Sequence, residues 1–190
     1  MLDTVLIWTQ RGAWLLWLVY WIVAARRAKT TRWHEPGWTR ALDAVLLLAA
    51  AFLMGARGAL PEPLTARFIP ADLTVFALAT VMTVTGLLFS VWARVHLGSN
   101  WSGTVTLKAE HALIRSGPYR FVRHPIYSGV LLALLGTVIA LGEWRGVIAL
   151  VLMFGAFLRR SRAEETQLRR IFSDYAQYAG TTAALIPGIY

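Results

Sequence analysis

The sequence predicts an all-α integral membrane protein with about five transmembrane helices, a C-terminal helical hairpin and a cytoplasmic amphipathic helix. Hydrophobic residues fill 57% of the 190 positions, and the mean hydropathy is +0.53; soluble domains average roughly 45–50% apolar residues. The apolar residues form long runs, and arginines gather at the ends of those runs. This placement of the net charge of +9 favours a membrane protein over a nucleic-acid-binding one.

The first half of the chain, residues 1–97, is expected to hold three membrane spans. They are predicted at residues 2–25, 41–60 and 73–97. The first run lacks the basic start and small-residue cleavage site of a secretory signal, and Arg26 and Arg27 follow it. We therefore expect a retained anchor. Pro61 and Pro63 close the second span.

The second half, residues 98–190, is expected to hold a polar loop, a helical hairpin and a charged helix within the same single domain. The loop covers residues 98–124, and the apolar runs 126–141 and 144–158 are joined only by Gly142-Glu143. Both runs are near or below the lower limit of about 17 residues for a span. They predict a tight hairpin, with a separate charged helix at 159–178.

Positive charge predicts the topology. The linker 26–40, the loop 98–124 and the helix 159–178 are rich in arginine, whereas the other two connections are close to neutral. The positive-inside rule then predicts that the N-terminus is outside and the C-terminus is in the cytoplasm. The expected location is an inner or plasma membrane. Both polar segments share the cytoplasmic side, so one site built from them is expected.

The segment RSGPYRFVRHPIYSG, residues 115–129, is the polar stretch that precedes the hairpin. Its Ser116-Gly117-Pro118 sequence predicts a turn, and Pro125 is typical of the first turn of a helix. His124 then lies in the cap region, where the N–H groups of a helix start attract carboxylate or phosphate.

Helical spacing selects two residues of the charged helix. At about 100° per residue, one apolar stripe is made by Leu168, Ile171, Tyr175 and Tyr178. Extended backward, the stripe reaches Glu164 and Arg160, so two ionisable residues are predicted on the inward face. The alternative is a simple ion pair between them. Glu165 is predicted to make an ordinary surface pair with Arg169.

These motifs resemble the isoprenylcysteine carboxyl methyltransferase and phospholipid methyltransferase group. The similarity lies in R-H-P-I-Y at 123–127, in R-x-R-A-E-E at 160–165 and in the final L-I-P-G at 185–188. It covers the chain from Leu97 onward, whereas the first two spans match only as generic membrane helices. The resemblance implies an integral membrane methyltransferase that uses S-adenosylmethionine and releases S-adenosylhomocysteine.

The resemblance also implies site residues, none of them metal ligands. The implied cofactor-binding residues are His111, Ala112, Leu113, Ile114, Tyr119, His124, Pro125, Ile126, Tyr127 and Glu164. Arg160 resembles the arginine that contacts the substrate, and Arg160 and Glu164 are the candidate catalytic residues.

The methyl acceptor remains open at this stage. A lipophilic or small apolar molecule would enter from the bilayer, with no obligate protein partner evident. An isoprenylcysteine carboxylate, a phospholipid amine and a small thiol are all compatible with the sequence. A carboxylate needs no general base, whereas an amine or thiol would require deprotonation by a residue such as His124 or Glu164.

Two other functional classes fit a helical membrane chain. A sterol-type reductase would need a site for the phosphates of a nicotinamide cofactor, for which the acidic pair Glu164-Glu165 is poorly suited. A non-enzymatic scaffold would leave the inward charges of Arg160 and Glu164 without a purpose.

Overall fold

The computed structural model of the chain describes residues 2–26, 31–34, 36–98, 106–108 and 113–188. Most of these residues lie in helices. The elements, in chain order, are α1 (Leu2–Ala25), β1 (Thr31–His34), α2 (Gly37–Gly55), η1 (Arg57–Ala59), α3 (Glu62–Thr65), α4 (Leu73–Leu97), β2 (Thr106–Lys108), η3 (Gly117–Arg120), α5 (Pro125–Leu141), α6 (Trp144–Ile171) and α7 (Tyr175–Thr181). The strands β1 and β2 pair antiparallel, a small addition to the predicted all-α fold.

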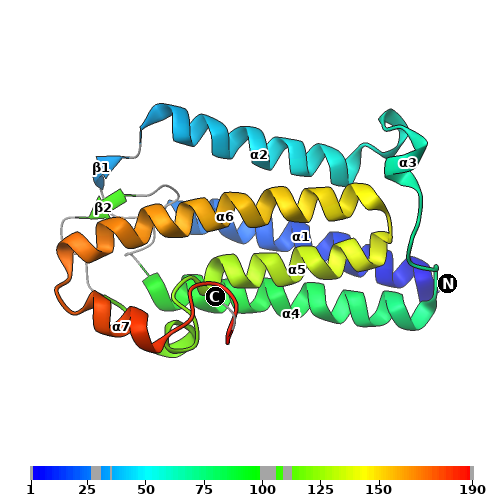
Figure 1. Ribbon diagram of the computed structural model, residues 1–190. Helices are drawn as coiled ribbons and strands as arrows, with labels where there is room; N and C mark the ends of the chain where they lie inside the picture. Colours follow the sequence, from blue (N-terminus) through cyan, green and yellow to red (C-terminus); the bar gives the residue numbers. More distant parts are fainter. Residues whose placement is uncertain (1, 27–30, 35, 99–105, 109–112, 189–190) are drawn as a thin grey trace.

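The long helices lie along a common direction (Figure 1). α4 and α5 form the central pair, α1 packs on α4, and α6 packs on α5. α2 packs on α6, on the outer side of the bundle. The short strands, α7 and the end of α6 gather at one end of the bundle, and the N-terminus lies at the other.

The helices have the apolar character of a membrane protein. Among the described residues, α2 and α4 are long and apolar enough to cross a bilayer, and α5 is a shorter apolar helix. Large apolar side chains also face outward, including Leu16 of α1, Leu48 of α2 and Val81 of α4, which are 71%, 68% and 63% exposed. A surface of this kind is suited to lipid, because lipid tails bury it without protein contacts.

Glycines allow α4 and α5 to approach closely. A Cβ atom on Gly129 would lie 2.6 Å from the carbonyl oxygen of Gly86 and 2.7 Å from the nitrogen of Ser90. A Cβ atom on Gly136 would meet the carbonyl oxygen of Ala79 at 2.6 Å. Small residues at such crossings are typical of membrane helix pairs, where close packing drives association.

Polar side chains fasten α1 to this pair. The amide of Gln10 donates to the Thr83 hydroxyl at 3.2 Å, and the Trp17 indole donates to Ser90 at 2.7 Å. The Trp14 indole donates to Thr137 of α5 at 3.0 Å. Hydrogen bonds of this kind help to fix helix register in a membrane, each contributing roughly 0.6–2 kcal/mol.

The end of the bundle opposite α7 is closed by a buried ion pair. Nε of Arg145 donates to Glu143 at 2.6 Å, and its Nη1 donates to the carbonyl oxygens of Leu53 and Met54, both at 2.8 Å. Arg145 thereby caps the C-terminal end of α2 from the start of α6. Gly142, with φ of +63°, completes the tight connection between α5 and α6.

The structure corrects the predicted boundary at residues 158 and 159. α6 runs without a break from Trp144 to Ile171, so the charged segment continues the second helix of the hairpin. Tyr175 and Tyr178 belong to α7, a separate helix, and Ile171 is 43% exposed. The predicted stripe therefore does not extend along one helix to residue 178.

Candidate active site

The segment before α5 is held between α4 and the C-terminal segment. Tyr119 is 7% exposed, and its hydroxyl donates to the carbonyl oxygen of Ala93 at 3.5 Å. The Tyr178 hydroxyl donates to the carbonyl oxygen of Tyr119 at 2.5 Å. Gly117 adopts a φ of +58° beneath the His96 ring, a conformation that L side chains rarely adopt.

Backbone hydrogen bonds continue this support to the start of α5. The N–H groups of Arg123 and His124 donate to the carbonyl oxygens of Ala183 and Ala184 at 2.9 and 3.0 Å. The Ser128 hydroxyl donates to the carbonyl oxygen of Leu185 at 2.5 Å. The C-terminal segment thus fixes the position from which His124 projects.

α5 begins as the sequence predicts, with His124 as N-cap and Pro125 in the first turn. The His124 side chain does not cap the helix, because its ring turns toward α6. Nδ1 of His124 lies 3.2 Å from Oε2 of Glu164, and Nε2 lies 3.2 Å from Oε1 of Glu165. One imidazole therefore bridges two adjacent carboxylates of α6.

Glu165 is also bound by Arg123. Nε of Arg123 donates to Oε1 of Glu165 at 2.7 Å, and Nη1 donates to the carbonyl oxygens of Ala179, at 2.9 Å, and Thr182. Arg123 thereby joins α6 to the C-terminal segment. The predicted surface pair with Arg169 is replaced by this half-buried contact, in which the Glu165 side chain is 15% exposed.

Glu164 is the more open carboxylate, with 27% of its side chain exposed. The Tyr127 hydroxyl donates to its Oε1 at 2.5 Å. The Tyr127 ring stacks on Phe157 at 4.7 Å and on His124 at 5.7 Å between ring centroids, with 11° between the planes in both pairs. Arg160 lies above Tyr127, with its guanidinium carbon 6.0 Å from the ring centroid.

These contacts determine the charge states of the cluster. Burial alone would lower the pKa of His124, but the hydrogen bonds that its ring donates to Glu164 and Glu165 outweigh burial and raise that pKa. Burial raises the pKa of Glu165, yet its contacts with His124 and Arg123 bring the value down to about 2. The pKa of Glu164 is likewise lowered, because His124 and Arg160 outweigh its burial. A carboxylate can only accept, so His124 donates from both nitrogens and is the imidazolium.

The structure brings some of the predicted residues together. His124, Tyr127, Arg160 and Glu164 share one cluster, and the buried Pro125 and half-buried Ile126 lie in the first turn of α5. Tyr119 instead directs its hydroxyl toward α4. Leu113 and Ile114 are half-buried in the segment before η3. His111 and Ala112 lie outside the described residues.

Sequence reasoning missed three members of the cluster. Helical spacing predicts a surface pair of Glu165 with Arg169, and it gives no signal for the actual partners, Arg123 and His124, which are about 40 positions away in the chain. Phe157 was counted only as part of an apolar run. Asp43 of α2, which pairs with Arg159 and lies 3.7 Å from Arg160, was not considered. An acidic residue within an apolar span was the available signal for Asp43.

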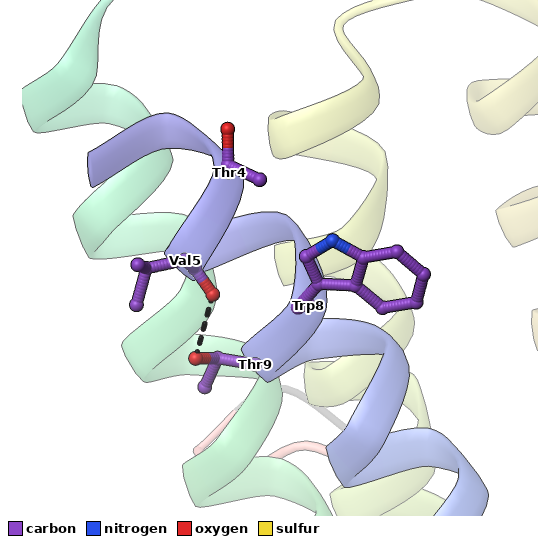
Figure 2. A pocket seen from close by; sticks show the side chains of 4 residues that line it. All are labelled: Thr4, Val5, Trp8 and Thr9. Atoms are coloured by element: carbon purple, nitrogen blue, oxygen red, sulfur yellow. Dashed lines mark hydrogen bonds between the residues drawn. The ribbon is translucent and has the colours of Figure 1, made fainter. Parts of the chain in front are cut away.

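A shallow hollow on α1 does not belong to this site. Figure 2 shows that Thr4, Val5, Trp8 and Thr9 line it. The Thr9 hydroxyl donates to the carbonyl oxygen of Val5 within the same helix at 2.8 Å. The hollow is open and lies near the N-terminus, at the end of the bundle away from α7 (Figure 1).

Comparison with known proteins gives the family of the chain. The family model for the isoprenylcysteine carboxyl methyltransferase family matches residues 78–170. A probable protein-S-isoprenylcysteine O-methyltransferase of Oryza sativa subsp. indica is 30% identical in an alignment of length 152 that covers 76% of this chain and 80% of the rice protein. The protein-S-isoprenylcysteine O-methyltransferase of Schizosaccharomyces pombe is 34% identical in an alignment of length 99 that covers 50% of this chain and 42% of the yeast protein.

Another relative is named for metal resistance and not for methyl transfer. The cobalt-zinc-cadmium resistance protein CzcN of Cupriavidus metallidurans is 31% identical in an alignment of length 123 that covers 62% of this chain and 50% of that protein. The match to the rice protein covers most of both chains, and the family model includes the whole His124, Glu164 and Glu165 cluster. The chain is therefore a membrane methyltransferase that belongs to the isoprenylcysteine carboxyl methyltransferase family.

Proposed function

We propose that this protein transfers a methyl group from S-adenosylmethionine to the ionised carboxylate of a lipophilic acceptor such as a prenylated cysteine. The observation that carries the proposal is the double contact of His124 with Glu164 and Glu165. Both ring nitrogens are occupied, so His124 is not a base that can accept a proton from an acceptor. Glu164, with a lowered pKa, is also a weak base.

A carboxylate acceptor needs no base at neutral pH. Its ordinary pKa is about 3.3–3.7, so it arrives ionised. An amine or a thiol would arrive protonated and would have to lose its proton before or during methyl transfer. The cluster therefore favours the isoprenylcysteine carboxylate over the phospholipid amine and the small thiol. Membership in a methyltransferase family argues against both the nicotinamide-dependent reductase and the scaffold.

The residues of the cluster fit the proposed cofactor. S-adenosylmethionine carries an ammonium group, a carboxylate and a nucleoside, and it supplies a methyl group activated on a sulfonium. Glu164 is ionised and partly exposed, which suits an ammonium or ribose hydroxyls. The Tyr127 hydroxyl, which donates to Oε1 of Glu164, would hold that carboxylate in place for such a contact. The first turn of α5, where no side chain of the described residues serves as cap, suits the carboxylate.

The remaining cofactor residues are proposed from the family resemblance. We assign Leu113, Ile114, Tyr119, Pro125 and Ile126 to the cofactor pocket, together with His111 and Ala112. His124 acts by holding Glu164 and Glu165 in place, and Arg123 acts by holding Glu165. This division of roles is supported by the hydrogen bonds that these two basic residues make within the chain.

Arg160 is the proposed acceptor-binding residue. Its planar guanidinium suits a carboxylate, which it can bind through two parallel hydrogen bonds. Positioning the acceptor in line with the methyl group supplies much of the rate in such a displacement. Methyl transfer from the bound cofactor would cancel the opposite charges of acceptor and cofactor, and a site of low dielectric would disfavour the charged starting state more than the transition state.

The positions of the helices support a membrane arrangement with five crossings. We propose that α1, α2, α4, α5 and the apolar part of α6 (144–158) cross the bilayer, with the N-terminus outside. The cluster then lies at the cytoplasmic end, beyond the apolar part of α6. A prenyl chain would remain in the bilayer while its carboxylate reaches Arg160.

The proposal is tested by offering the purified protein four candidate acceptors with isotopically labelled S-adenosylmethionine. We expect methylation of N-acetyl-S-farnesylcysteine, with the label released as methanol by mild base, which is the signature of an ester. We expect no transfer to the corresponding amide, to phosphatidylethanolamine or to a small alkyl thiol. Transfer to the amine or the thiol at a comparable rate would overturn the proposal.

A further inference from the structure

α2 contributes to the candidate active site although it lies outside residues 78–170, the range that the family model matches. It packs on α6 through a buried cluster of Ala50, Ala149 and Met153. Phe157 packs against this cluster and also stacks on Tyr127. The packing between α2 and α6 therefore continues into the aromatic stack of the site.

Asp43 lies on the same side of α2, seven positions before Ala50, which is about two helical turns. Its carboxylate pairs with Arg159 and lies 3.7 Å from Nη1 of Arg160, with the Asp43 side chain 13% exposed. A charged residue in a membrane helix costs about 2.5–3.5 kcal/mol or more at its centre, and less near its ends. Asp43 lies near the start of α2, and its ion pair with Arg159 offsets part of this cost.

Arg160 connects Asp43 to the methyl-transfer site. Its guanidinium lies over the Tyr127 ring, and its charge acts on Glu164, one helical turn farther along α6. The side chain of Arg160 is 19% exposed, so it is confined between α2 and α5. Small movements of Asp43 would change the direction in which the Arg160 guanidinium points.

We propose that Asp43 is a positioning residue that holds Arg160 in the orientation required by the acceptor carboxylate. This inference rests on the proposed function, because it assigns Arg160 to the acceptor. Asp43 pairs with Arg159 and also attracts the guanidinium group of Arg160 toward α2.

The variant Asp43→Asn tests the role, because asparagine has nearly the same shape but no charge. We expect kcat for N-acetyl-S-farnesylcysteine to fall about tenfold, since a misplaced orienting group lowers the rate of the positioned reaction. The acceptor KM should change less than about threefold, because the added positive charge offsets the looser fit. The Kd of S-adenosylhomocysteine should stay at the wild-type value, because Glu164 and Tyr127 are unchanged.

Two further variants separate positioning from general stability. Asp72 is an exposed N-cap of α4, remote from the site, and Asp72→Asn should leave kcat, KM and Kd unchanged because asparagine caps equally well. Asp43→Glu keeps the charge and should recover a large part of the lost kcat. A loss of cofactor affinity equal to the loss of kcat in Asp43→Asn would overturn the inference.

A double-mutant cycle tests whether Asp43 acts through Arg160. Arg160→Lys keeps the charge but loses the planar fork, so the effect of Asp43→Asn on kcat should be much smaller in that background. Equal effects in both backgrounds would overturn the inference. If Asp43→Asn does not fold, the variant Arg159→Gln is tested instead. Without Arg159, Asp43 is expected to attract Arg160 away from Tyr127 and so to lower kcat. Wild-type kcat in Arg159→Gln would equally overturn the inference.

Failure of the inference is distinguishable from failure of the proposed function. If the wild-type protein methylates N-acetyl-S-farnesylcysteine and Asp43→Asn retains wild-type kcat, only the role of Asp43 is refuted. If the wild-type protein leaves this acceptor unmethylated, the proposed function is refuted, and the role of Asp43 in acceptor binding is refuted with it.

Discussion

At the scale of single residues, His124 has an unusual position for a residue next to a proposed reaction centre. It is 6% exposed, and each of its ring nitrogens lies 3.2 Å from a carboxylate oxygen. We expect a histidine held in this way to organise charge and not to exchange protons with the substrate. The positive charge of His124 would neutralise one of the two adjacent carboxylates, Glu164 and Glu165, and its two ring nitrogens would hold both carboxylates in place.

The charge of His124 predicts how stability depends on pH. Its folded pKa is raised above 6.5, so its contribution is fully present below pH 6.5 and is lost as the pH rises through the folded value. Glu165 has a folded pKa of about 2 against 4.5 unfolded, so its contribution is present above pH 4.5 and is lost as the pH falls toward 2. We expect the cluster to stabilise the protein most between these two limits, pH 4.5 and 6.5.

Thermal unfolding in detergent, measured from acidic to alkaline pH, checks this expectation. The midpoint temperature should decline above pH 6.5 in the wild-type protein. In His124→Gln the midpoint should be lower at pH 6 and should lose this alkaline decline. A wild-type midpoint that rises from pH 6 to pH 8 would contradict the assignment of an imidazolium.

Glu164 and Arg160 should separate cofactor binding from turnover. Glu164→Gln should weaken S-adenosylhomocysteine binding about tenfold to a hundredfold, because a charge-assisted hydrogen bond contributes about 1.5–3 kcal/mol. Arg160→Ala should leave that affinity nearly intact while kcat collapses. Calorimetric titration and turnover measurements on the same preparations give both quantities.

The adjacent acid offers a matched control for this prediction. Glu165 contacts His124 as Glu164 does, but Arg123 covers it. Glu165→Gln should lower the unfolding temperature while changing the cofactor Kd less than about threefold. If Glu164→Gln and Arg160→Ala lose cofactor affinity equally, the two residues form only an ion pair and the division of roles is wrong.

At the scale of elements, the sequence predicts helix identity better than helix ends. Apolar runs located α1, α4 and α5 to within a few residues, because hydropathy and Pro125 mark them directly. The change from apolar to charged residues after Leu158 suggested a new helix, but hydrogen bonding along the backbone does not depend on side-chain polarity, and α6 continues. The inward positions of Arg160 and Glu164 were predictable because spacing within one helix is local.

Contacts between elements were not predictable from spacing. Glu165 meets Arg123, and Asp43 meets Arg159, across elements whose relative rotation depends on packing of the whole bundle. Helical angles rank the faces of a single helix and give no information on which neighbour covers each face. For that reason the sequence placed Glu165 on the surface.

The packing of α4 on α5 gives a prediction at this scale. Gly129→Ala should lower the free energy of unfolding by about 1–3 kcal/mol, the usual cost of overpacking, because the new methyl group would meet backbone atoms of Gly86 and Ser90. Gly155 lies within α6, and a Cβ atom there would meet no atom within 4 Å. Gly155→Ala should therefore cause no loss, and equal losses in both variants would contradict close packing as the cause.

At the scale of the whole molecule, the site depends on segments from one end of the bundle. Arg123 and His124 come from the connection between α4 and α5, Glu165 comes from the end of α6, and Ala183 comes from the C-terminal segment. These segments meet because each long helix reverses the direction of the preceding one (Figure 1). A membrane protein can build such a site only if all these segments emerge on the same side of the bilayer.

The arrangement therefore predicts the sides of two chain positions. From the positive charge on the connections, we expect the end of the bundle that carries the site to lie in the cytoplasm. A reporter fused after Tyr190 should report the cytoplasm, and a reporter inserted beside Glu62, in the connection at the opposite end, should report the outside. The matched control inserts the same reporter after Pro36, at the start of α2, where it should report the cytoplasm. The same side for Tyr190 and Glu62 would contradict an odd number of crossings between them, and with it the membrane arrangement that brings acceptor and cofactor together.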